Sequence, residues 1–308
     1  MKKFLIVFAA LTVFAACNRS PEFYFKRGNY LVATGKPMQA LENYNHAIIL
    51  KRSYPEALTA RGMLYERQND RPNAEADYLK AIEADGNYIP AYNNLAAFYM
   101  DADNYRKAID YLDTALRIKP KYEYALLNRG LSYYKLGDCA KAKQDLTEAL
   151  SVNPRFDMAL YHRGKCFFKE NNYYGAAKDF GDLVKINPSA SAAWVELGKI
   201  KAQEKDFKTA AQFFQKAVLG NERDFNALYN YAYALMELKD RDDALKIALE
   251  AEKENGEDCR LSVLLADIYG AEDRTKASEY YSKASGLCRA SGLGAYEKYA
   301  LKQVARQS

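Results

Sequence analysis

The sequence has few of the residues from which catalytic and metal centres are built. Its 308 residues include only two histidines, His46 and His162, and five cysteines. None of them forms a cysteine–histidine cluster with the spacing of a metal site. The sequence suggests no Ser/His/Asp set and has no glycine-rich loop of the kind that cradles phosphate. We therefore expect a protein without catalytic residues, metal ligands or cofactors.

The sequence also lacks long blocks of charge of one sign. Its 45 basic and 40 acidic residues are interspersed, and the formal net charge is +5. The basic stripe that indicates nucleic-acid binding is missing, so we expect no nucleic-acid partner. What the sequence has in abundance is tyrosine, with 26 copies. Tyrosine combines a large apolar body with a polar tip, which suits both helix packing and hydrated interfaces.

The N-terminus has the layout of an export signal. Lys2 and Lys3 precede an apolar run that ends at Phe14, and Cys17 follows two alanines. This run is too short to span a bilayer comfortably as a helix, and its layout is typical of a secretory signal peptide. A plain secretory signal is one interpretation, but it prefers small residues one and three positions before the cut.

The stretch "VFAAC" resembles the lipobox of bacterial lipoproteins, although Phe14 stands where that family usually has leucine. The resemblance implies that residues 1–16 are removed, that Cys17 is lipidated, and that residues 17–20 form a tether. By resemblance to lipoprotein sorting signals, the absence of aspartate directly after Cys17 implies the outer membrane. The lack of an acidic cluster there implies its periplasmic face.

Small residues recur every 34 positions through most of the chain, with alanines and aromatic residues at fixed offsets between them. The series that defines the period is Gly28, Gly62, Ala96, Gly130, Gly164, Gly198, Ala232 and Ala266. Proline closes several of the periods, for example at Pro120 and Pro154. A fixed period of this length indicates a repeat architecture.

This pattern resembles the tetratricopeptide repeat (TPR) family. The resemblance implies an all-α solenoid of about eight helix-turn-helix repeats over residues 21–291, wound as a right-handed superhelix. Each repeat consists of a helix A and a helix B, and the small residues let these two approach closely. The eighth repeat, residues 259–291, has one residue deleted in its turn.

Residues 292–308 are expected to form a C-terminal capping helix and tail. Leu293, Tyr296, Ala300 and Val304 are spaced along one face of such a helix. A helix that binds a partner is the alternative interpretation.

In the TPR family, helix A lines the concave groove. Carrying those positions over gives a groove set with many aromatic and apolar residues, which are typical of binding surfaces. The set is Asn94, Tyr124, Leu127, Asn128, Leu131, Tyr134, Tyr161, His162, Lys165, Phe168, Tyr229, Asn230 and Tyr233. Its three asparagines resemble the ladder with which some TPR proteins hold a peptide backbone. Three interpretations remain open for the aromatic residues: a partner-binding surface, core packing or a homodimer interface.

Two cysteines lie at matching ends of the eighth repeat. Cys259 opens its helix A and Cys288 lies near the end of its helix B. These ends are adjacent in an antiparallel helix pair, so the pair can form a disulfide, and two buried thiols are the alternative.

We therefore expect a non-catalytic interaction scaffold that binds a protein or peptide in its groove and the membrane through lipid on Cys17. Resemblance to periplasmic TPR lipoproteins suggests roles in cell-envelope assembly or in docking cell-wall enzymes. The alternative is a structural lipoprotein that self-associates as a homodimer through its groove face.

Overall fold

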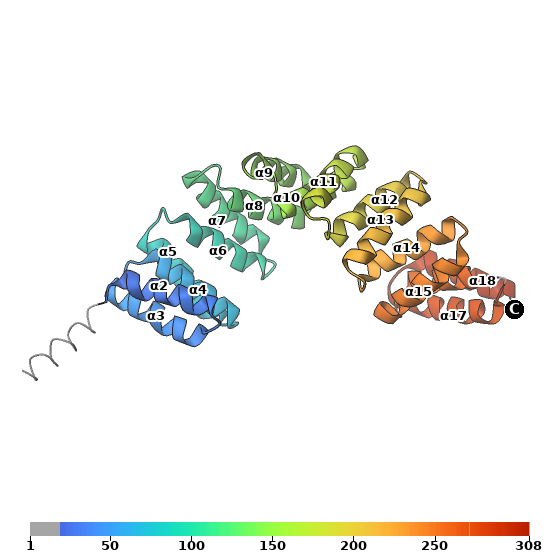
Figure 1. Cartoon of the computed structure of the whole chain (residues 1–308), viewed down its shortest axis with the longest axis horizontal. Coiled ribbons are helices and arrows are strands. Elements are labelled where there is room, and N and C mark those ends of the chain that lie inside the picture. Colours follow the sequence, from blue (N-terminus) through green and yellow to red (C-terminus); the bar gives the residue numbers. More distant parts are fainter. Residues whose placement is uncertain (1–18, 271, 308) are drawn as a thin grey trace, which may run out of the picture. The chain divides into compact units, whose positions relative to one another are not determined.

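The computed structural model describes residues 19–270 and 272–307, which contain seventeen helices and no strand (Figure 1). The all-α repeat fold predicted from the sequence is confirmed. The expected signal peptide and Cys17 lie outside the described residues. The chain divides into two compact units between Pro154 and Arg155.

Unit 1 consists of four consecutive helix pairs. Its A helices are α2 (Pro21–Ala33), α4 (Pro55–Arg67), α6 (Ile89–Met100) and α8 (Glu123–Lys135). Its B helices are α3 (Pro37–Leu50), α5 (Arg71–Ala84), α7 (Tyr105–Ile118) and α9 (Cys139–Val152). Each A helix packs on its own B helix, and α3, α5 and α7 each contact the next A helix of the unit.

Unit 2 repeats this arrangement and adds a last helix. Its A helices are α10 (Asp157–Lys169), α12 (Ser191–Gln203), α14 (Phe225–Glu237) and α16 (Cys259–Tyr269). Its B helices are α11 (Tyr173–Ile186), α13 (Phe207–Gly220), α15 (Arg241–Asn255) and α17 (Arg274–Ala290), and α18 (Gly294–Gln307) follows.

The turn from helix A to helix B has the same chemistry in repeat after repeat. Its central residue has a positive φ in all of the first seven pairs, at Gly35, Asn69, Asp103, Gly137, Asn171, Lys205 and Lys239. The next residue is usually Asp or Asn, which caps helix B. Asn104, for example, accepts a hydrogen bond from the backbone N–H of Lys107. Local sequence therefore fixes where each pair turns.

The small residues at period 34 lie where helix B passes closest to helix A. A Cβ placed on Gly130 would lie 2.9 Å from Leu146 Cγ, and one on Gly198 would lie 2.4 Å from Phe214 Cε1. Both distances are shorter than packed carbon atoms allow. The prediction that small residues let the two helices approach is confirmed.

Buried arginine–aspartate pairs also hold helix A to helix B. Arg61 and Asp77, Arg129 and Asp145, and Arg163 and Asp179 are each joined at 2.7 or 2.8 Å. The guanidinium group donates two hydrogen bonds to each carboxylate, which is the strong bidentate arrangement. In each pair the aspartate follows the arginine by sixteen residues, and the pairs themselves follow the 34-residue period.

Helix α18 covers the exposed side of the last helix pair. Ala300 is fully buried, and Val304 packs against a cluster that includes Val263, Ala277 and Tyr281. Leu293 and Tyr296, which were assigned to the same buried face, remain 38% exposed. Only the C-terminal part of the predicted face therefore works as a cap.

Candidate binding surface

The expected groove residues lie on A helices in both units. We call the exposed side chains of α2, α4, α6 and α8 the A-helix face of unit 1. Those of α10, α12, α14 and α16 form the A-helix face of unit 2. Within each unit, neighbouring A helices such as α6 and α8, or α12 and α14, contact one another.

In unit 1, helix α8 presents less apolar surface than its sequence suggests. Tyr124 is 50% exposed, whereas the side chains of Leu131 and Tyr134 are less exposed, because each is already half-buried. Leu127 is 7% exposed, so the structure places it in the interior and not on the binding surface. Leu127 therefore belongs to the core of unit 1, unlike the exposed Tyr124 on the same helix.

The asparagines partly satisfy one another and their own helices. The Asn128 amide donates to Asn93 Oδ1 at 3.0 Å, and the Asn230 amide donates to the backbone carbonyl of Asn226 at 2.6 Å. Asn94 is half-buried on α6. Each amide nitrogen still has a second hydrogen to donate, so a peptide backbone would find a reduced set of donors.

In unit 2, charged groups of α10 and α12 form ion pairs through one oxygen of Glu196. Lys165 Nζ lies 2.8 Å from Glu196 Oε1, and Lys199 Nζ lies 3.2 Å from the same oxygen. Glu196 is only 4% exposed, so both ammonium groups offset the burial of its charge. Lys165 therefore has a structural partner within the protein.

The aromatic members on α10 pack mainly within the unit. The Tyr161 ring lies 5.2 Å from the ring of His162 and 5.9 Å from that of Phe180. The Phe168 ring lies 5.5 Å from that of Tyr173. All of these α10 side chains are half-buried, so they contribute edges and not whole rings to the surface.

Helix α14 carries the most open aromatic group of the predicted set in unit 2. Tyr233 is 38% exposed, while Tyr229 lies under the guanidinium of Arg260, whose central carbon is 5.1 Å from the ring centroid. Burial, and next the nearby Tyr296 phenol, raise the pKa of Tyr229 well above its usual value. Tyr229 is therefore an uncharged aromatic group at every physiological pH.

Helix α18 completes a pocket that the sequence analysis missed. Val263, Asp267, Ala295, Tyr296 and Tyr299 line it. Tyr299 donates to Asp267 Oδ1 at 2.9 Å, Tyr281 donates to the same oxygen, and burial raises the pKa of Asp267. Its signal in the sequence is the Tyr296 and Tyr299 pair, which a helix acting only as a cap does not need.

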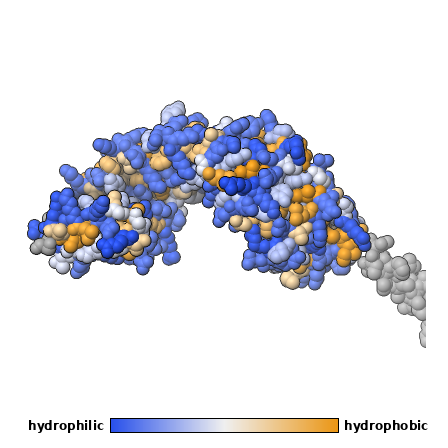
Figure 2. Space-filling view, turned by 180° about the vertical axis from the view of Figure 1, so that it is seen from behind, coloured by the Kyte–Doolittle hydropathy of each residue, from blue (hydrophilic) through white to orange (hydrophobic). Residues whose placement is uncertain are grey.

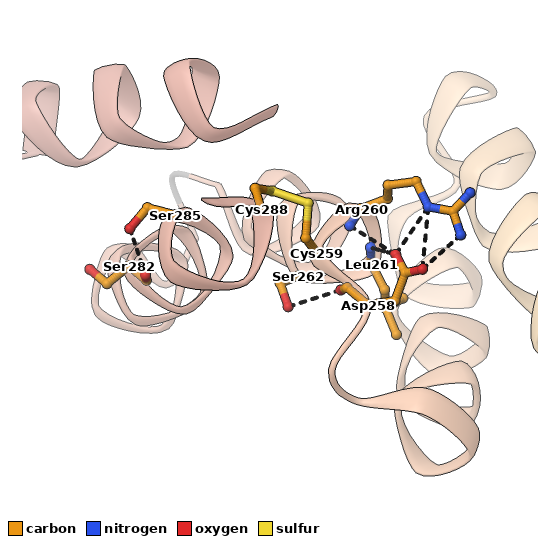
Figure 3. Close-up of a disulfide and its surroundings, with 8 residues drawn as sticks. All are labelled: Asp258, Cys259, Arg260, Leu261, Ser262, Ser282, Ser285 and Cys288. Carbon is orange, nitrogen blue, oxygen red and sulfur yellow. Dashed lines mark hydrogen bonds and ion pairs between the residues drawn. A yellow bond between two sulfur atoms is a disulfide. The ribbon is translucent and has the colours of Figure 1, made fainter. Parts of the chain in front are cut away.

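The structure joins Cys259 and Cys288 in a disulfide, with the two Cα atoms 5.1 Å apart (Figure 3). The bond ties the start of α16 to the end of α17. Next to it, Asp258 caps α16 by accepting from the backbone N–H groups of Arg260 and Leu261.

The described residues show no group of three or more His, Cys, Asp and Glu side chains that could hold a metal ion. Nor does any helix in the described ranges reach the length and hydropathy of a membrane span. On the surface, hydrophobic residues gather in small patches between larger hydrophilic areas (Figure 2).

Known protein families share this architecture of helix pairs. Two tetratricopeptide repeat family models match, one at residues 25–89, 127–189 and 167–224 and the other at residues 88–155. The chain belongs to the tetratricopeptide repeat family. The TPR fold is a protein–protein interaction scaffold, and proteins of the family are generally non-catalytic.

Individual relatives are similar over part of their length. The human "Tetratricopeptide repeat protein 6" is 31% identical over 109 residues, which is 35% of this chain and 21% of that protein. The protein ycf37 of Porphyra purpurea is 37% identical over 83 residues, 27% of this chain and 46% of its own length. The chain thus spans less than half of the length of these curated relatives.

A solved TPR protein from Parabacteroides merdae has a TM-score of 0.58 at 20% identity, covering 82% of this chain and 100% of that one. The pilF structure from Pseudomonas aeruginosa has a TM-score of 0.62 at 18% identity, covering 67% of this chain and 94% of that one. At these identities the likeness shows the fold alone.

Proposed function

We propose that this protein is a non-catalytic adaptor, anchored by lipid on Cys17 and binding a partner protein or peptide on its A-helix face. The expected setting is the periplasmic face of a bacterial outer membrane, in cell-envelope assembly or in docking of a cell-wall enzyme. The lipobox-like stretch before Cys17 supports the anchor, and the TPR fold supports the adaptor role.

The observation that carries the binding proposal is the exposed aromatic surface at the C-terminal end of unit 2, where α18 contacts α16 and extends the A-helix face. Tyr233, Tyr296 and Tyr299 are each between 38% and 40% exposed, although they lie next to buried core. Burial, and next the nearby Glu237, raise the pKa of Tyr233, and Tyr296 and Tyr299 lie three residues apart on α18. Clustered, half-exposed tyrosines are typical of the central residues of protein interfaces.

The pocket on α16 and α18 gives this surface a defined shape. Its tyrosine rings form apolar walls, and Asp267 supplies one acidic group within hydrogen-bond reach of two phenols. A concave apolar lining with few polar groups is suited to receive a side chain inserted by the partner, more than to form a flat contact.

Photo-crosslinking in cells tests the proposal. A photoreactive phenylalanine replaces Tyr233 or Tyr296, and Tyr174 on α11, which is 85% exposed, is the matched control position. We expect Tyr233 and Tyr296 to capture one defined protein that the Tyr174 position does not capture. Equal capture from all three positions, or none from the first two, would contradict a binding surface there.

The same experiment distinguishes the self-associating alternative. If the captured protein is a second copy of this chain, and light scattering gives the mass of a dimer, the surface is a homodimer interface. In that case Tyr233→Ala with Tyr296→Ala restores the monomer mass without loss of helical content.

A further inference from the structure

The first helix pair differs from the others at the positions where pairs stack. The third and tenth residues of each repeat lie on the side of helix A that meets the preceding B helix. In the six pairs that follow another pair within their own unit, these residues are at most 4% exposed. They are Ala57, Leu64, Ala91, Phe98, Ala125, Ser132, Ala193, Ile200, Ala227, Ala234, Leu261 and Ile268.

On α2 the same two positions are aromatic and open. Phe23 is 39% exposed and Tyr30 is 66% exposed. The terminal repeats of a solenoid normally need a polar outer face for solubility. The first helix of this chain instead presents two large rings, an apolar surface suited to a contact with something other than water.

Positive charge surrounds the two rings. Lys26 and Arg27 are exposed and lie between Phe23 and Tyr30 at the i, i+3, i+4, i+7 spacing of a single helix face. The Arg19 guanidinium lies over the Phe23 ring, with its central carbon 4.5 Å from the ring centroid. We call these five residues the first-helix face. Glu22 is the one carboxylate on α2.

Arg27 has a different setting from the arginines at the same repeat position. Arg61 and Arg129 each form an ion pair with the aspartate sixteen residues later. The residue sixteen positions after Arg27 is Asn43, whose amide donates to the Gln39 carbonyl at 2.7 Å. The charge of Arg27 therefore faces outward and is suited to an external anion.

The position of Cys17 indicates which anionic surface this is. Pro21, the start of α2, lies only four positions after Cys17 in the sequence. Four extended residues reach roughly 14 Å at most, so a lipid on Cys17 would hold α2 at the headgroup layer. Aromatic rings concentrate at the membrane–water interface, and basic side chains are attracted to anionic lipids.

We propose that the first-helix face is a second membrane contact, which lies on the anionic headgroups of the bilayer that holds the lipid on Cys17. This inference rests on the proposed lipid anchor. A second copy of the chain is a poorer occupant, because a symmetric contact would bring the three cations of one face against those of the other. The contact would fix the direction in which unit 1 leaves the membrane.

Fluorescence quenching of the full lipidated chain in vesicles of phosphatidylethanolamine and phosphatidylglycerol tests this contact. The only tryptophan is replaced by Trp194→Phe, and a reporter is then placed by Phe23→Trp, Tyr30→Trp or, as the control, Tyr174→Trp. Lipids brominated near the headgroup should quench the reporters at positions 23 and 30 and leave the one at position 174 unchanged. Adding Arg27→Glu should reduce the quenching, whereas Lys208→Glu, at an exposed position on α13, should not.

The outcomes separate the two proposals. If the chain floats with the vesicles but positions 23 and 30 are quenched no more than position 174, the anchor stands and the membrane contact is wrong. If the chain does not float with vesicles, both the anchor and the contact are wrong. Absent quenching combined with a crosslink between two chains at position 30 would assign the face to a second copy.

Discussion

At the scale of single residues, the packing of helix A on helix B depends on matched sizes. Glycine at the period-34 position accompanies a large residue sixteen positions later, as in Gly62 with Tyr78 and Gly198 with Phe214. Where alanine takes the glycine position at Ala96, the later residue is the smaller Leu112. Two positions depart from this relation: Gly130 is followed by Leu146, and Ala266 is followed fifteen positions later by Tyr281. The size of one residue therefore largely sets the room left for the other.

The first prediction concerns Gly198. Gly198→Ala should lower the free energy of unfolding by about 1–2 kcal/mol, because overpacking outweighs the gain in helix propensity. Adding Phe214→Leu should return part of that loss, because the new pair copies Ala96 and Leu112. Urea denaturation of the two single variants and the double variant measures the coupling between these residues.

Gly86→Ala is the control, since a Cβ there meets no atom within 4 Å. Equal effects of Gly86→Ala and Gly198→Ala would show that close packing is not the reason for glycine at position 198.

The second prediction concerns the pH dependence of stability at Asp267. Burial raises the pKa of Asp267 above its ordinary value of 3.8, so the folded chain holds this proton more tightly than the unfolded chain does. Stability from this group is therefore greatest below the ordinary pKa and declines as the pH rises through the raised value.

Asp267→Asn keeps an acceptor for Tyr281 and Tyr299 and removes the buried charge. We expect the variant to be at least as stable as the wild type at pH 7 and equal to it near pH 3. Denaturation midpoints measured across that range check this result. A variant that is less stable at pH 7 and equal at pH 3 would mean that the charge itself stabilises the fold.

At the scale of helices, the last helix pair is held by more than packing. The disulfide between Cys259 and Cys288 closes a separation of 29 residues around α16 and α17, and α18 covers the same pair. Tyr299 of α18 donates to the Asp267 carboxylate of α16, and Tyr296 of α18 lines the same pocket, so the pocket depends on α18 staying in place. The disulfide stabilises the pair on which α18 rests.

The third prediction follows from this bond. Cys288→Ser should lower the free energy of unfolding by about 3–4 kcal/mol. Without the disulfide the unfolded chain has more conformational entropy, and folding must remove it. Thermal unfolding with and without reductant measures the effect, and reductant should not destabilise the variant further. Cys139→Ser, at a half-buried thiol, is the control and should keep the response to reductant.

At the scale of the whole molecule, each unit is stabilised by contacts between neighbouring helices. Every A helix except the first of a unit contacts the preceding B helix of its own unit, and the described contacts join near neighbours in sequence. Stability in such a chain is close to a sum of pair terms and interface terms. At its ends the outer face of the terminal helix has no neighbouring pair to stack on, so its side chains can bind something else.

The fourth prediction concerns the anchor, which acts on the molecule as a whole. Cys17→Ser should move the protein from the membrane fraction to the soluble fraction and change its processed mass, because no lipid is attached. Fractionation and mass spectrometry of the two proteins give the result. Retention of the variant in the membrane at an unchanged mass would show that Cys17 is not the point of attachment.

The sequence by itself determined the helix pairs, their period and their close approaches. Glycine and alanine at period 34, and Asp or Asn at the start of helix B, act locally, so their effect can be derived without knowing the packing. The helical register also placed the predicted groove residues on A helices, although it did not indicate the pocket between α16 and α18.

Only the tertiary structure decided which of those residues are open. Leu127 is buried, and Lys165 forms an ion pair with Glu196. Tyr299 and Tyr281 both donate hydrogen bonds to Asp267. The repeat pattern treats all A helices alike, whereas exposure depends on what packs beside each one. The same register position is therefore buried at Ala57 and open at Phe23, because no described helix precedes α2.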